Sequence, residues 1–303
     1  MGALDEDSNH DVRIFSLAIL LGSYFIYNSV GSIDENALSQ LSLVINLTKN
    51  IQIKAGKIND EIDPEEYAQY FPSFMWVVRD FTLQLLDSEQ EPITPKEYLE
   101  KALGNQKGFS EAVEQKNRIR KLLKSFFKER DCCTMIRPLT QESQLQNLVE
   151  MEMESLRAEF VEQVHTLRRK VINRIKPKTI NGRPLNGEML FNLASSYATA
   201  INNGAVPSIE NSWSYICKNE CLKAVATSFA EFERLFYEWF QDQVPMQEEE
   251  LKRIFKQAKN TALEIFNKTA VGEVKDEFLT QLKKNMRQKF SHFSLENEKS
   301  SES

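Results

Sequence analysis

The chain has 303 residues, a formal net charge of −6, and a composition that is 41% hydrophobic and 27% charged. These values are typical of a globular protein with one large or two smaller domains, and the mild acidity argues against nucleic acid as the main partner. The longest apolar run, Ile14 to Tyr27, contains Gly22 and is too short to cross a bilayer. Because the first residues do not resemble a signal peptide, we expect a cytoplasmic protein without a direct membrane anchor.

The cysteines and histidines show no pattern typical of a metal or catalytic site. Their positions are Cys132, Cys133, Cys217, Cys221, His10, His165 and His292. A zinc site needs several ligands at short fixed spacings, and the histidines lie far apart. The sequence also lacks a Ser-His-Asp or Cys-His arrangement and an H-E-x-x-H motif. We therefore predict no metal site and no catalytic residue in this chain, and we expect reduced thiols.

The first part of the chain alternates between helical and strand patterns. In chain order, the predicted elements are a helix over 12–23, a strand over 24–32, a helix over 36–54, a strand over 73–81, helices over 94–103 and 115–127, and a strand over 131–138. The helix over 94–103 opens with a capping signature, formed by Thr94, Pro95 and Glu97. Strands that alternate with helices imply a parallel α/β sheet.

After Pro138 the pattern becomes helical. Apolar residues from Leu145 to Val171 keep a spacing of three or four, which predicts one face of a long helix. Turn residues over 176–187 follow. Further helical patterns cover 187–203, 208–242, 248–272 and 278–293.

This change of pattern predicts the domain organisation. We expect an α/β domain over 1–138 and an all-α domain over 139–294. The remaining segment, 295–303, is polar and has the composition of a disordered tail.

The second predicted strand ends in Arg79 and Asp80, after the apolar run Phe74 to Val78. In open α/β sheets, ligands bind at the carboxyl ends of the strands. A carboxylate at this place suits guanine, because its two oxygens accept hydrogen bonds from the N1–H and N2 amino groups, and adenine has no such pair of donors. A neighbouring arginine can lie against the base or pair with a phosphate. Taken alone, the local pattern favours an ordinary solvated strand end.

Longer stretches around these residues resemble one family. "FPSFMWVVRDFTLQL", followed by "PITPKEYLEKAL", resembles the large GTPases of the guanylate-binding protein family, which are relatives of the atlastins in the dynamin superfamily. "FFKERDCCTMIRP" is similar to the last strand of that family's GTPase domain, and "INGRPLNGEMLFNLASSYATAINNGAVPSIENSW" to the start of its helical domain. The resemblance extends from about residue 11 to residue 240. It implies the C-terminal part of a P-loop NTPase sheet followed by an all-α domain.

The resemblance also implies a function and its residues. Members of the family bind GTP with Mg²⁺, hydrolyse it and form homodimers through their GTPase domains. By resemblance, Asp80 reads guanine and Arg79 assists. The family's phosphate-binding loop, G-x-x-x-x-G-K-S/T, has no match: the only Gly-Lys is Gly56–Lys57, with Ile51 and Ile58 at the other required positions. We therefore expect an N-terminally truncated chain that lacks the phosphate and Mg²⁺ ligands, binds guanine nucleotide weakly at best, and is a poor GTPase alone.

The alternative is a nucleotide-free helical module that pairs with a full-length relative or another partner. Its contact residues would be the large aromatic side chains Trp213, Phe236, Tyr237 and Trp239. Aromatic residues at helical spacing more often belong to the core. Loss of GTP binding in the purified chain would favour this alternative, and a phosphate-binding loop encoded upstream in the same message would favour the GTPase.

Overall fold

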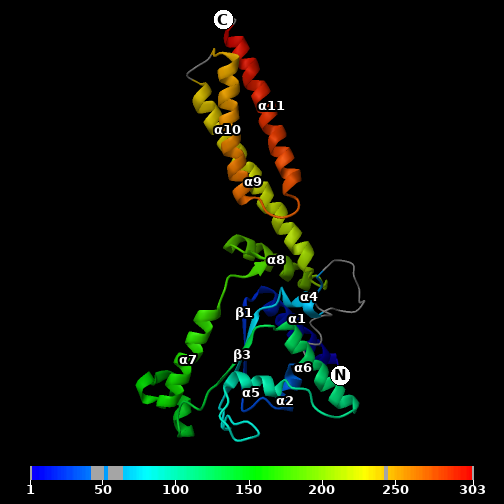
Figure 1. Cartoon of the computed structure of the whole chain (residues 1–303), viewed down its shortest axis with the longest axis vertical. Helices are drawn as coiled ribbons and strands as arrows, with labels where there is room; N and C mark the ends of the chain where they lie inside the picture. Colours follow the sequence, from blue (N-terminus) through cyan, green and yellow to red (C-terminus); the bar gives the residue numbers. More distant parts are fainter. Residues whose placement is uncertain (1, 42–50, 54–63, 242–244, 302–303) are drawn as a thin grey trace. The chain divides into compact units, whose positions relative to one another are not determined.

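The computed structural model describes residues 2–41, 51–53, 64–241 and 245–301 (Figure 1). The chain divides into two compact units, Met1–Ile209 and Glu210–Ser303. The first unit contains a small parallel sheet with helices, and the described part of the second unit contains only helices. The predicted change from an α/β region to an all-helical region is therefore confirmed.

The parallel sheet has the order β1-β2-β3, formed by Tyr24–Val30, Ser73–Arg79 and Arg130–Thr134. These are the three predicted strands. In the registers, Val30 lies beside Arg79 and Val78 lies beside Thr134, so the strands end together. Strand β2 is in the centre because its residues from Phe74 to Val78 are buried on both faces, whereas β1 alternates between half-buried and exposed residues.

Helices cover both faces of the sheet. On one face, helix α7 (Ala158–Arg174) places three partly buried residues against a core cluster of four sheet-face residues. The helix residues are Phe160, Val164 and Leu167, and the core residues are Met75, Val77, Cys133 and Met135. On the other face, Phe25 meets Phe15 of helix α1 (Gly2–Leu21) at 5.3 Å between ring centroids, and Phe74 meets Phe127 at 4.9 Å. Aromatic packing of this kind holds the helices on the sheet.

The other α-helices that the structure describes in the first unit are α2 (Glu35–Gln40), α4 (Pro64–Ala68), α5 (Pro95–Ala102), α6 (Glu111–Phe126) and α8 (Gly187–Asn202). The capping box predicted for α5 is confirmed. The Thr94 hydroxyl accepts a hydrogen bond from the Glu97 amide at 3.2 Å, and the Glu97 carboxylate accepts one from the Thr94 amide at 2.7 Å. These bonds satisfy two amides at the start of the helix that have no partner within it.

Two helix predictions need correction. The helix predicted over 36–54 appears only as α2, since 42–50 lie outside the described residues, and Gln52 instead forms a β-bridge with Ser208. The long helix predicted from Leu145 to Val171 is broken into the 3₁₀ segments η1 (Glu142–Glu150) and η2 (Met153–Ser155) before α7 begins. Neither 3₁₀ segment buries a residue, so apolar spacing there had no core to pack against and did not sustain an α-helix.

The predicted turn region over 176–187 contains a short hairpin. Its strands are β4 (Thr179–Ile180) and β5 (Arg183–Pro184), and the turn is Asn181–Gly182 with φ values of 50° and 74°. Positive φ at both central residues is the geometry of a type I′ turn, which favours Asn-Gly. The hairpin fixes the position of the residue that precedes it, Lys178.

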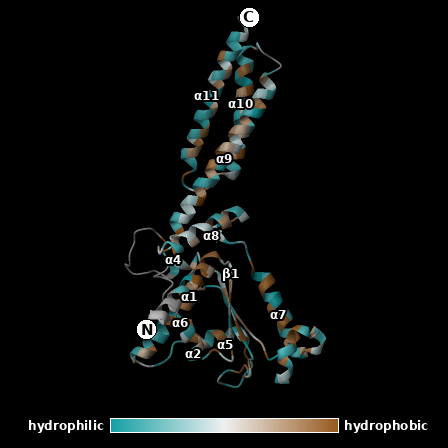
Figure 2. Ribbon diagram, turned by 180° about the vertical axis from the view of Figure 1, so that it is seen from behind, coloured by the Kyte–Doolittle hydropathy of each residue, from teal (hydrophilic) through white to brown (hydrophobic). Residues whose placement is uncertain are grey.

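The second unit contains α9 (Ile209–Phe240), α10 (Glu248–Thr269) and α11 (Lys275–Ser301). Phenylalanines from all three helices meet in the core. The ring centroids of Phe236 and Phe293 are 4.5 Å apart, and those of Phe255 and Phe290 are 4.4 Å apart. Figure 2 shows polar and apolar residues alternating along α10, as expected for a helix with one buried face. Within the described ranges, every helix is too short or too polar to cross a bilayer.

Helix α11 continues to Ser301, through the segment whose composition predicts disorder. Phe293 and Asn297 are buried there. The Asn297 side chain accepts a hydrogen bond from the Met246 amide at 2.8 Å and donates one to the Met246 carbonyl at 3.0 Å. Met246 lies just before the first residue of α10, and its pairing with Asn297 explains why α11 continues into this segment. The domain boundary near residue 138 stays a prediction. Helix α7 follows that residue in the chain and packs on the sheet.

Candidate functional site

The carboxyl edge of the sheet, where β1, β2 and β3 end, is the candidate site. Backbone hydrogen bonds continue past the strand ends and hold the following residues together. The Gly31 amide donates to the Arg79 carbonyl at 2.8 Å, and the Phe81 amide donates to the Met135 carbonyl at 2.9 Å. Gly31 has a φ of 93°, which glycine adopts without strain and which lets the chain turn away from the strand. The segments after all three strands are therefore fixed at one edge.

Asp80 stands at the centre of this edge in an unusual conformation. Its φ is 53°, in the left-handed region that few residues other than glycine occupy. Its carboxylate lies 3.6 Å from Nε of Arg137, and its side chain is 35% exposed. Partial exposure leaves the carboxylate accessible to a ligand. Residues held in such conformations are found preferentially at binding sites.

Arg137 is a residue of this candidate site that the sequence did not predict. It pairs with Glu142 as well as with Asp80. The hydrogen bond that Arg137 donates to the Glu142 carboxylate is the main cause that raises the pKa of Arg137 above its usual range, followed by the negative charges of Glu142 and Asp80. A signal was available, because Arg137 follows the third predicted strand, and parallel strands end at the same edge.

Arg79 is also at this edge, but it has a different partner from Asp80. Its Nε donates a hydrogen bond to the Asn28 side chain on β1 at 2.9 Å. Both Arg79 and Asp80 therefore lie at the predicted edge. The Arg79 side chain bonds to β1, and the Asp80 side chain pairs with Arg137.

Aromatic and hydroxyl contacts support the segments on either side of Asp80. Phe81 and Tyr98 pack edge to face, with ring centroids 5.4 Å apart. The Tyr98 hydroxyl accepts a hydrogen bond from the Ile33 amide at 2.9 Å. Tyr98 of α5 thereby joins the segment after β1 to the segment after β2. Burial is the main cause that raises the pKa of Tyr98, so the hydroxyl keeps its proton at neutral pH.

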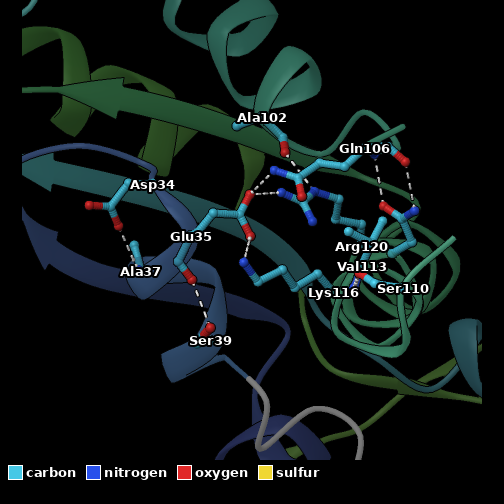
Figure 3. A network of polar contacts seen from close by, with 11 residues as sticks. Asp34, Glu35, Ala37, Ser39, Ala102, Gln106, Ser110, Val113, Lys116 and Arg120 are labelled. Atoms are coloured by element: carbon cyan, nitrogen blue, oxygen red, sulfur yellow. Dashed lines mark hydrogen bonds and ion pairs between the residues drawn. The ribbon is translucent and has the colours of Figure 1, made fainter. Parts of the chain in front are cut away.

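A polar network lies beside this edge (Figure 3) and joins α2, the end of α5 and α6. Buried Arg120 donates from Nε to the Ala102 carbonyl at 3.1 Å and pairs with Glu35. Lys116 lies 3.4 Å from the same carboxylate, and the Gln106 side chain donates to it at 2.5 Å. Because Glu35 follows β1 by only a few residues, the network positions the loop between α5 and α6 relative to the carboxyl edge.

The chemistry of this edge is that of one carboxylate, Asp80, with two arginines, Arg79 and Arg137, at the same edge. Asp80 offers two acceptor oxygens, as the guanine edge requires. Among the described residues, no group of three His, Cys, Asp or Glu side chains has the arrangement of a metal site. Gly56–Lys57, the one Gly-Lys pair, lies outside the described residues. Cys132 packs in the sheet, and its burial raises the pKa of its thiol to about 12, so it has little thiolate for reaction.

Comparison with known proteins gives one consistent result. The family model for the guanylate-binding protein N-terminal domain matches residues 1–180, and the model for the C-terminal domain matches residues 181–303. The chain is 32% identical to human guanylate-binding protein 2 over 298 residues, which is 97% of this chain and 50% of that protein. It is 32% identical to human guanylate-binding protein 1 over 300 residues, with the same coverage. The chain spans about half the length of these curated relatives.

Proposed function

Because the chain belongs to the guanylate-binding protein family, we propose that its carboxyl edge binds the base of a guanine nucleotide. The single observation that carries this proposal is Asp80, with its left-handed backbone at the end of the central strand and its carboxylate 3.6 Å from Arg137. Asp80 reads the base in this proposal, and Arg79 assists from the side of β1.

The geometry supplies a physical account of base recognition. Arg137 lies 3.6 Å from the Asp80 carboxylate and limits its orientation. An ionised carboxylate accepts two hydrogen bonds from guanine, each contributing about 1.5–3 kcal/mol, whereas adenine offers no matching donors. At 35% exposure, water competes for the same oxygens, so the gain is at the lower end of that range.

GTP hydrolysis needs more than the base site. Mg²⁺ neutralises charge on the phosphates, and a phosphate-binding loop holds them. The described residues do not supply such a ligand set, and we derive no hydrolytic step from them. We propose GTP hydrolysis, and pairing through GTPase domains, only for a protein in which this base site is joined to a phosphate-binding loop.

The proposal is tested by binding of guanosine and adenosine monophosphates to the whole chain, followed by NMR. These ligands carry the same phosphate, so a difference in affinity reports the base. We expect guanosine monophosphate to shift the amide signals of Arg79 and Asp80 with weak affinity, and adenosine monophosphate to leave them unchanged. Asp80→Asn should weaken the guanine complex about tenfold, because one charged acceptor is lost.

Asp11→Asn is the matched control. It makes the same change of charge at an exposed residue of α1. Equal binding of the two nucleotides, or equal loss in both variants, would contradict the proposal.

The alternative, a helical module that binds through its aromatic residues, has no observation in its favour. Trp213 and Phe236 are buried, and Trp239 packs against the core of the second unit. Of the four aromatic residues considered, Tyr237 alone is exposed, at 55%. The helical aromatic residues mainly form the core.

A further inference from the structure

At the amino edge of the sheet, where β1 and β2 begin, a lysine is held almost entirely out of water. Lys178 is 9% exposed. Its Nζ donates hydrogen bonds to the carbonyls of Gly22 at 2.9 Å and Tyr70 at 2.7 Å. These carbonyls come shortly before β1 and β2, so the ammonium lies between the two strand starts.

The charge of Lys178 is not compensated by the part of the chain that the structure describes. Its ammonium has three N–H groups, and within the described residues it donates to two neutral carbonyls rather than to a carboxylate. Burying a charge without a counter-charge is unfavourable. The desolvation is visible in its titration, since burial lowers the pKa of Lys178 to about 8.

This ammonium lines a hollow of about 290 Å³, which we call the amino-edge hollow. Three lysines and one carboxylate line it: Lys128, Lys176, Lys178 and Glu129. Glu129 accepts a hydrogen bond from the Ser73 hydroxyl at 2.8 Å and lies 3.9 Å from Lys176. Lys128 pairs with Glu65 at 3.1 Å. The lining therefore carries an excess of positive charge, and Lys178 is the one buried residue among these four charged ones.

A second, more open hollow of about 610 Å³ adjoins the first, sharing Ser73, Lys128, Glu129 and Lys176. Its own cations are largely neutralised: Arg130 pairs with Glu100, and Arg174 pairs with Asp131 at 2.8 Å. The buried charge without a counter-charge among the described residues is therefore in the amino-edge hollow and not in the second hollow.

We propose that the amino-edge hollow binds a small molecule with a phosphate or carboxylate group, and that this group pairs with the Lys178 ammonium. The rings of Phe71 and Phe126 line the same hollow and offer apolar contact to the rest of the ligand. The hollow is at the opposite edge of the sheet from Asp80. It takes an anion, whereas the carboxyl edge offers a carboxylate, so the two edges differ in ligand chemistry.

Binding of an anion at Lys178 is linked to its protonation. The anion pairs with the charged form, so it raises the pKa of Lys178 above its value in the free protein. The other titratable groups that line the hollow are Tyr70, Lys128, Glu129 and Lys176. Since the free pKa is about 8, the charged fraction falls about tenfold between about pH 7 and about pH 9, and the affinity should fall with it.

NMR of the lysine ammonium groups in the whole chain tests this directly, with inorganic phosphate and succinate as separate probes. Succinate is a dianion throughout this pH range, whereas inorganic phosphate takes up a proton at about pH 7, so the pH dependence measured with succinate reports the lysine alone. We expect at least one probe to raise the pKa of Lys178 by about one unit and to lose about tenfold in affinity over the same range. Phosphate alone would identify a phosphate ligand, and succinate alone a carboxylate. No shift of Lys178 with either probe would overturn the proposal.

Two variants separate the hollow from general charge. Lys176→Gln removes a cation that lines it, and Lys121→Gln removes an exposed cation of α6 outside it. We expect Lys176→Gln to weaken binding several-fold and Lys121→Gln to leave it unchanged. An equal loss of anion affinity in the two variants would show that binding depends on the net charge of the chain and would overturn the proposed site. Neither variant removes a contact of Lys178 with the strand starts, so both should fold.

Discussion

The two edges of the central sheet treat charge in opposite ways. At the carboxyl edge, Asp80 is partly exposed and has a cation, Arg137, at 3.6 Å. At the amino edge, Lys178 is buried and bonded to neutral carbonyls. At the carboxyl edge a ligand can reach a carboxylate that has a cation beside it, and at the amino edge a ligand can neutralise a buried charge. In our two proposals, one small sheet supports two sites that differ in the charge they offer to a ligand.

The largest expected effect comes from the strand that both edges share. Trp76 is fully buried in β2 and donates from its indole to the Ser29 hydroxyl at 2.8 Å. Trp76→Ala should lower the free energy of unfolding by about 3–5 kcal/mol, because it removes a large side chain from a packed core. Binding at both edges should weaken together in a denaturation and ligand titration series.

The matched variant for that experiment is Phe236→Ala in the core of the second unit. It should cost stability of similar size and leave binding at both edges unchanged. If Trp76→Ala lost ligand binding at only one edge, the two edges would not both depend on the packing of β2.

The next effect distinguishes the amino edge by its pH dependence. The pKa of Lys178 is about 8 in the folded chain, against 10.5 for an ordinary lysine side chain. Between these two values the unfolded chain holds a proton that the folded chain has released, so stability gained from this group rises as pH increases. The rise should be on the order of 3 kcal/mol and should be absent in Lys178→Met, measured as the difference between the two denaturation profiles. The same pH dependence of the free energy of unfolding in both chains would contradict the claim that Lys178 carries a buried charge without a counter-charge.

A smaller effect concerns the network beside the carboxyl edge. Arg120→Met removes the cation that joins Glu35 to the Ala102 carbonyl. Because Glu35 is 35% exposed, the cost should be about 1–3 kcal/mol, below the range for a fully buried pair. Binding of guanosine monophosphate should weaken while phosphate binding at the amino-edge hollow stays the same. A loss confined to the amino edge would reverse the assignment of this network.

The smallest effect is local. Thr94→Ala removes the N-cap of α5, and the free energy of unfolding should fall by about 1 kcal/mol. Ser110→Ala provides the comparison, since Ser110 caps α6 through a longer bond of 3.4 Å and should cost less. Chemical denaturation of both variants checks the order, and a larger loss for Ser110→Ala would contradict it.

The sequence predicted the carboxyl edge because strands and their ends can be read from local patterns. Asp80 was found by its place after an apolar run, and Thr94 by a capping motif. Lys178 could not be found in this way, because its partners are backbone carbonyls 156 and 108 residues away, and a carbonyl has no sequence signal. The predicted long helix before α7 was wrong for a related reason, since apolar spacing does not show whether a core is present.

The central claim is that the Asp80 carboxylate recognises guanine, and its most direct test is a change of base preference. Xanthosine monophosphate carries a carbonyl in place of the guanine amino group. We predict that the unmodified chain prefers guanosine over xanthosine monophosphate and that Asp80→Asn reverses this order, because the amide donates a hydrogen bond where the carboxylate accepts one. A reversal also shows that the variant is folded. An unchanged order of affinities in Asp80→Asn would contradict the account.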